Sequence, residues 1–183
     1  MDCDVLTLSG LWNSGPEHWQ THWERKHPEF VRVPHRDYNN PVRDEWVEEL
    51  DAAIAASDGP PILVAHSLGV QLVVQWARSQ SDLKIAGALL VAPSDTEAPS
   101  YPVPANGFAP VPLDKLPFPT IVAASGNDPF VSPARARQFA DAWGSQFVEV
   151  GNLGHINGDS NLGDWPVGAT LLAQLCAQVP HDA

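Results

Sequence analysis

One serine lies where a buried strand is expected to turn directly into a helix. Ser67 follows the apolar run Ile62–Ala65 and precedes Leu68, which opens a segment with helical spacing of its apolar residues. Ala65 and Gly69, two positions either side of the serine, are small, as a tight turn requires. A serine hydroxyl at such a turn is a candidate nucleophile, and the backbone N–H of Leu68 is a candidate donor to a developing oxyanion.

An acid and a base follow later in the chain, each after a strand-like run of its own. Asp128 comes after Thr120–Ala124, and His155 comes after Gln146–Val150. Because parallel strands end at one edge of a sheet, we expect Ser67, Asp128 and His155 to meet there. The histidine could take the serine proton and return it to a leaving group, while the aspartate fixes the imidazole tautomer. The pattern favours a Ser–His–Asp triad over three unrelated turn and loop residues.

Two other acids compete with Asp128 for this role. Asp95 follows the strand-like run before Thr120–Ala124, and Asp159 lies close to His155 in the sequence. We favour Asp128 because its loop follows the strand that comes one element before the histidine loop.

The loop after the first strand-like run offers a second oxyanion donor. Gly10 allows the backbone to approach the serine closely, so the N–H of Leu11 is our candidate, with Trp12 beside it. Trp12, Phe108 and Trp165 lie near the predicted site elements and are our candidate substrate contacts.

The elements that position these residues alternate regularly along the chain. The strand-like runs are Val5–Ser9, Phe30–Val33, Ile62–Ala65, Ile85–Val91, Thr120–Ala124 and Gln146–Val150, and the helix-like segments are Pro16–Lys26, Arg43–Ala56, Leu68–Arg78, Pro133–Trp143 and Val167–Gln178. Most runs are apolar without polar alternation, which is typical of strands buried on both faces of a parallel sheet. We therefore expect one α/β domain over 1–183, a three-layer α/β/α sandwich with a six-stranded parallel sheet.

A proline-rich loop, Pro93–Pro119, interrupts the alternation. Its 27 residues hold eight of the 18 prolines in the chain. Proline prevents helix formation, and long loops inside compact domains are usually functional or disordered. Two interpretations stay open, a cap over or beside the site that uses Tyr101, Phe108 and Phe118, or a rigid crossover that merely covers the sheet.

The net charge bears on which partners the protein can bind, and the cysteines and apolar runs bear on its compartment. Ten Lys and Arg against 22 Asp and Glu give a net charge of −12, which disfavours nucleic acids and anionic membranes as partners. For Cys3 and Cys176 we favour free thiols, although a single disulfide stays open. No signal-peptide pattern and no apolar stretch of membrane-spanning length is visible, so we expect a cytoplasmic protein.

Histidines outside the triad are assigned ordinary roles. His18 and His22 lie four residues apart on an expected helix, a spacing that can hold zinc, but no third ligand is apparent and we predict no metal site. His66 should point away from Ser67 by strand alternation and pack or form hydrogen bonds instead.

The sequence resembles the small serine hydrolases of the retinoblastoma-binding protein 9 and YdeN type, a compact branch of the α/β-hydrolase superfamily. The motifs that carry the resemblance span nearly the whole chain: GLWNSGPEHWQ at 10–20, DEWV at 44–47, AHSLG at 65–69, LPFP at 116–119, NDP at 127–129 and GHIN at 154–157. The resemblance implies the same triad, Ser67, Asp128 and His155, with no cofactor.

The resemblance also implies a sheet that lacks the first two strands of the usual hydrolase sheet, with strand order 2-1-3-4-5-6. Right-handed crossovers would then place the first and last helices on one face of the sheet. One departure concerns partners. The name of the mammalian member reflects an L-x-C-x-E motif, which neither Cys3 nor Cys176 occupies, so we expect no retinoblastoma-type partner.

We therefore expect a serine hydrolase that cleaves small carboxylic esters, with thioesters and amides as further candidates, through an acyl-enzyme. The alternatives are a non-catalytic binding protein of the same fold, and a perhydrolase or lyase that uses the same triad. Because 183 residues leave no room for a helical lid domain, we expect a shallow pocket that prefers short acyl chains.

Overall fold

Six parallel strands form the middle layer of the molecule. A computed structural model describes residues 3–179, with strands β1 (Val5–Leu8), β2 (Val31–Arg32), β3 (Ile62–His66), β4 (Gly87–Val91), β5 (Thr120–Ala124) and β6 (Gln146–Glu149). They lie in the order β2-β1-β3-β4-β5-β6, and every neighbouring pair is parallel. This confirms the predicted order and brings the carboxyl ends of all six strands to one edge.

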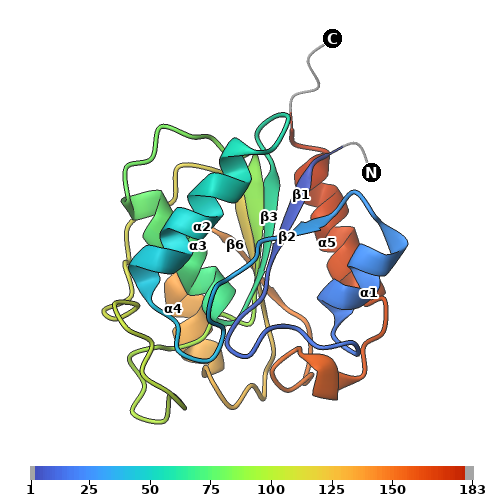
Figure 1. Cartoon of the computed structure of the whole chain (residues 1–183). Coiled ribbons are helices and arrows are strands. Elements are labelled where there is room, and N and C mark those ends of the chain that lie inside the picture. The colour runs from blue at the N-terminus through green and yellow to red at the C-terminus, as the bar shows by residue number, and fades with distance from the viewer. Residues whose placement is uncertain (1–2, 180–183) are drawn as a thin grey trace.

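Helices cover both faces of this sheet (Figure 1). One face is covered by α1 (Trp19–Lys26) and α5 (Pro166–Cys176), and the other by α2 (Arg43–Ala55), α3 (Leu68–Arg78) and α4 (Pro133–Trp143). The first and last helices therefore share a face, as right-handed crossovers predict. The three-layer α/β/α sandwich expected from the sequence is confirmed.

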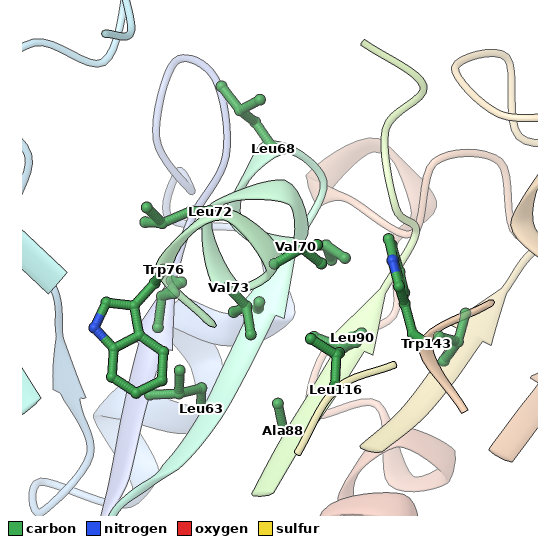
Figure 2. Close-up of a cluster of buried hydrophobic side chains, with 14 of the residues drawn as sticks. Leu63, Leu68, Val70, Leu72, Val73, Trp76, Ala88, Leu90, Leu116 and Trp143 are labelled. Atoms are coloured by element: carbon green, nitrogen blue, oxygen red, sulfur yellow. The ribbon is translucent and has the colours of Figure 1, made fainter. Parts of the chain in front are cut away.

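Each face of the sheet has its own apolar cluster. Leu63 of β3 belongs to the cluster under α2, α3 and α4, whereas its neighbour Val64 belongs to the cluster under α1 and α5. Successive side chains of a strand point to opposite faces, so burial of both faces explains why the strand-like runs lack polar alternation. Figure 2 shows the first cluster, in which Val70 and Val73 of α3 point toward the strands that carry Leu63 and Leu90.

The structure shortens several predicted elements. Helix α1 begins at Trp19 instead of Pro16, because the His18 side chain caps it by accepting a hydrogen bond from the Gln20 N–H. Strand β2 is reduced to two residues at the edge of the sheet, where the Val31 side chain is exposed. Among residues 3–179, no helix combines the length and the apolarity needed to cross a bilayer.

Cys3 and Cys176 form a disulfide, which corrects the prediction of free thiols. Their Cα atoms lie 5.8 Å apart although 173 positions separate them in the sequence. Cys3 precedes β1 and Cys176 ends α5, and α5 packs against the middle of the sheet so that its last turn reaches the start of β1. Only the course of α5 brings the two residues together, so their spacing in the sequence could not reveal the pair.

Candidate active site

Ser67 sits on a strained turn between β3 and α3. Its backbone has φ 59° and ψ −119°, a conformation that costs energy for any residue with a side chain, and its N–H donates to the Val91 carbonyl at 3.0 Å. The turn packs tightly on the β1 loop. A Cβ on Gly69 would lie 2.6 Å from the Leu8 carbonyl oxygen, and one on Gly10 would lie 2.9 Å from the Ser67 Cβ. Glycine at both positions therefore has a steric cause.

The structure brings the three predicted triad residues into one hydrogen-bonded row. His155 Nε2 lies 2.8 Å from Ser67 Oγ, and His155 Nδ1 lies 2.9 Å from each carboxylate oxygen of Asp128. The Asp128 side chain is buried, and its Oδ1 also accepts a hydrogen bond from the Phe130 N–H at 2.8 Å. The Phe130 ring packs edge-on against the His155 imidazole, with 4.6 Å between ring centroids. A neutral His155 with its proton on Nδ1 can accept the serine proton at Nε2.

Neither competing acid contacts the His155 imidazole. The Asp95 carboxylate pairs with Arg135 of α4 at 3.3 Å. Asp159 lines the mouth of the same cavity, but its side chain is exposed and the carboxylate that meets His155 belongs to Asp128.

Two polar side chains fasten the Asp128 loop to the His155 loop. Asn127 Oδ1 accepts hydrogen bonds from the Gly154 N–H at 2.8 Å and from the Ser125 hydroxyl at 2.9 Å. Ser125 Oγ in turn accepts from the Leu153 N–H at 2.9 Å. The sequence reasoning did not assign these residues a role, although two polar residues directly after a buried strand were a visible signal.

Neither predicted oxyanion donor, Leu11 or Leu68, has its backbone N–H taken up by a protein acceptor in the described part of the chain. The Trp12 N–H, by contrast, is used by the Tyr38 carbonyl at 3.0 Å. The Cβ that Gly10 lacks would come within 3.1 Å of the Leu68 nitrogen, so the two loops lie side by side. The arrangement can accommodate an oxyanion between them.

Arg32 holds the loop that carries Leu11. Its guanidinium donates to Asn13 Oδ1 at 3.1 Å and to the Ser14 carbonyl at 2.8 Å, and it pairs with Glu24 of α1 at 2.8 Å. Asn13 Oδ1 also accepts from the Ser9 hydroxyl at 2.8 Å. Arg32 belongs to the short edge strand β2, and no sequence signal marked it.

A cavity of about 370 Å³ opens at the nucleophile. Of the predicted substrate contacts, Trp12 lines it, and this residue is 57% exposed. The other two predictions are wrong. Phe108 is fully buried against Trp46 in the core, and Trp165 packs against the tryptophans of α1 beneath the sheet. Each of these rings buries a large apolar surface inside the molecule instead of facing the cavity.

The proline-rich loop contributes different residues to the cavity, Ser94, Tyr101 and Pro102. Ser94 Oγ lies 2.6 Å from Ser67 Oγ, so the nucleophile has a second hydroxyl as its neighbour. Burial raises the pKa of Tyr101 to about 12, against the opposing effect of its hydrogen bond to Ser94. Phe118, the third aromatic side chain expected in a cap, lies by a separate hollow beside Trp76.

His18 and His66 lie at the site, whereas His22 does not. His66 forms hydrogen bonds, as predicted: its Nε2 lies 2.8 Å from the His155 carbonyl oxygen, and its Nδ1 lies 3.3 Å from His18 Nε2. His22 points elsewhere, with its Nδ1 3.7 Å from Asp164. His18 and His22 therefore do not converge on one point.

Comparison with known proteins places this geometry in context. The sequence matches the model of the family described as serine hydrolase over residues 5–174. A YdeN-like hydrolase from Pectobacterium atrosepticum is 33% identical, with a TM-score of 0.86 over 96% of this chain and 92% of that one.

Two further solved structures show a similar fold. The ydeN gene product of B. subtilis is 19% identical, with a TM-score of 0.78 over 94% of this chain and 98% of that one. A thermophilic esterase from Thermogutta terrifontis is 16% identical, with a TM-score of 0.69 over 96% and 90%. A comparison with curated proteins finds no match. These likenesses agree with the predicted α/β-hydrolase fold.

Proposed function

The chain belongs to the serine hydrolase family, and from that premise we propose that it cleaves small carboxylic esters through an acyl-enzyme on Ser67. One observation carries the proposal: His155 lies within hydrogen-bonding distance of both Ser67 Oγ, at 2.8 Å, and the Asp128 carboxylate, at 2.9 Å. His155 is the general base and acid, and Asp128 fixes its tautomer and stabilises the imidazolium. Membership of an enzyme family also weighs against the non-catalytic alternative.

The proposed reaction has two proton-balanced stages. The Ser67 hydroxyl proton passes to His155 Nε2 as Oγ attacks the ester carbonyl carbon, and the proton then moves to the departing alcohol oxygen as the C–O bond breaks. Water follows the same route: it gives a proton to His155, attacks the acyl carbonyl and releases the carboxylic acid as Ser67 recovers its proton. In both stages the N–H groups of Leu11 and Leu68 would stabilise the oxyanion.

The cavity supports a short acyl group as the preferred substrate part. Its volume of about 370 Å³ lies at the low end of the range for small-molecule sites, and it is shared between the acyl and alcohol portions. Pro102 and the partly buried Tyr101 border it on the side of the proline-rich loop. Thioesters and amides of similar size remain within the proposal, since the same chemistry serves them.

A fluorophosphonate probe and two esters test the proposal. Ser67→Ala should abolish both probe labelling and turnover of p-nitrophenyl acetate, whereas Ser79→Ala, at an exposed serine just after α3, should change neither. Turnover should fall from p-nitrophenyl acetate to p-nitrophenyl dodecanoate. Persistent turnover in Ser67→Ala would refute the mechanism, and a preference for the long ester would refute the substrate class alone.

The cytoplasmic location expected from the sequence stays a proposal. The Cys3–Cys176 disulfide weighs against it, because disulfides form and persist mainly in oxidising compartments. Separating the compartments of the source cell and detecting the protein in each would decide the matter.

A further inference from the structure

We propose that His18 and His66 form a neutral hydrogen-bonded chain that positions His155, the base in the proposed function on which this inference rests. The chain runs from α1 through the residue before the nucleophile to the main chain of the base. Its links are Gln20 N to His18 Nδ1 at 3.1 Å, His18 Nε2 to His66 Nδ1 at 3.3 Å, and His66 Nε2 to the His155 carbonyl oxygen at 2.8 Å. Both imidazoles are buried.

The groups at the two ends fix the direction of every hydrogen bond. The Gln20 N–H can only donate, so His18 Nδ1 must accept and a neutral His18 carries its proton on Nε2. The His155 carbonyl can only accept, so His66 carries its proton on Nε2 and offers a lone pair at Nδ1. The middle link is then satisfied by His18 Nε2–H donating to His66 Nδ1. Both ends thus require the same pair of tautomers.

The surroundings keep the two rings neutral. Burial is the main cause that lowers the pKa of His18 to about 3, and the positive charge of Arg32 and the neighbouring His155 and His22 act in the same direction. Burial also holds the pKa of His66 well below its usual value, aided by His18 and His155. A second proton on His18 would point at the Gln20 N–H, and a second proton on His66 would point at the Nε2–H of His18. The hydrogen bonds through the two histidines therefore keep one direction and one geometry at neutral pH.

The loop that this chain holds is strained next to the base. Ile156, directly after the base, has φ 51°, a rare conformation for a β-branched residue. A strained backbone of this kind persists only where several contacts from the surrounding structure hold it in place. Two ring N–H groups hold this backbone at consecutive carbonyl groups. His66 donates to the His155 carbonyl, and Trp19 of α1 donates to the Ile156 carbonyl at 2.8 Å.

Losing the His66 hydrogen bond should therefore displace the imidazole of His155 and lower the rate of turnover. A catalytic group that moves by about 1 Å can lose on the order of 100-fold in rate. The effect should appear in kcat per active site, because His66 acts through the position of His155. His66 also lines the cavity, so KM is compared between the leucine and glutamine variants to separate the shape of the cavity wall from the hydrogen bond. A residue that merely supported the fold would lower the number of active molecules and leave kcat per active site unchanged.

The test compares variants that keep or remove the donor. His66→Leu should lower kcat roughly 10- to 100-fold per site titrated with fluorophosphonate, whereas His66→Gln, whose amide can still donate, should retain most of it. If His66→Leu does not fold, His18→Leu against His18→Gln gives the same comparison, with a smaller loss. His22→Gln, in α1 but not part of the hydrogen-bonded histidines, should behave as the wild type.

Two outcomes would overturn the inference: a wild-type kcat per site in the leucine variants, or equal losses in the leucine and glutamine variants. Failure of the proposed function has a different signature, because turnover would then persist in Ser67→Ala. A kcat that depends on Ser67 but not on the His66 donor refutes only the positioning chain.

Discussion

At the scale of single residues, His18 shows how burial determines charge. It lies in a hydrogen-bonded chain beside the site, yet it has no acidic partner within that chain and Arg32 is among the groups that oppose its protonation. In the unfolded state the same imidazole takes up a proton near its ordinary pKa of 6.5, which stabilises the unfolded chain in acid. The neutral histidines therefore lower the free energy of unfolding only when the solution becomes acidic.

The stability of the protein should therefore fall as the pH drops below 6.5. The pKa of His18 is lowered from 6.5 to about 3 on folding, so the unfolded chain binds a proton that the folded chain refuses between these values. Each such histidine should reduce the free energy of unfolding by about 1.4 kcal/mol per pH unit. Urea unfolding from about pH 7 to about pH 5 should show a shallower decline for His18→Gln than for the wild type. Parallel curves for the two proteins would contradict this account.

At the scale of elements, polar side chains from neighbouring elements hold two of the loops that carry site residues. Asn13 after β1 is held by Arg32 of β2, and Asn127 after β5 holds the loop after β6. The strands only bring the loops to one edge. The side-chain hydrogen bonds between loops fix the distances on which proton transfer depends.

Removing the Asn127 brace should loosen the acid loop from the base loop. Asn127→Ala loses the acceptor for the Gly154 N–H and the Ser125 hydroxyl, which should lower the free energy of unfolding by about 1–2 kcal/mol. Turnover of p-nitrophenyl acetate per titrated site should fall roughly tenfold as His155 gains freedom. Asn127→Asp keeps an acceptor oxygen and should retain more activity. Equal turnover in Asn127→Ala and the wild type would show that the brace has no part in positioning.

The elements that the sequence predicted well are those whose signal is local. Apolar runs identified all six strands, and a serine between small residues identified the turn at Ser67. The errors concern which way a loop faces. Phe108 and Trp165 lie in loops near the site, but only the packing of the whole chain decides that both rings turn inward. Ser94 was missed for the same reason, since its contact with Ser67 joins two loops.

At the scale of the whole molecule, the sheet separates the disulfide from the site. The loops that carry Ser67, Asp128 and His155 follow the carboxyl ends of the strands, whereas Cys3 precedes the amino end of β1. Figure 1 shows the start of β1 and the end of α5 at one end of the molecule and the loops after the strands at the other. Stability and catalysis can therefore be altered at opposite ends.

Replacing both cysteines should change stability without changing catalysis. The Cys3→Ser/Cys176→Ser variant should lose about 2–4 kcal/mol of unfolding free energy, because the disulfide restricts an unfolded chain over 173 positions. Its kcat and KM for p-nitrophenyl acetate should match those of the wild type. A reducing agent should destabilise the wild type to the same level and leave the double variant unaffected. An unchanged urea midpoint in the double variant would mean that the disulfide contributes nothing to stability.

The same disulfide closes almost the entire polypeptide into a covalent ring. Every strand, every helix and every loop at the site lies between Cys3 and Cys176. A protease that cuts one peptide bond anywhere in that ring opens it to a linear chain but sets no fragment free. The packed sheet can keep the nicked halves in place, so one cleavage in an exposed loop need not end the life of the molecule, and only a second cut or a reductant would release a piece.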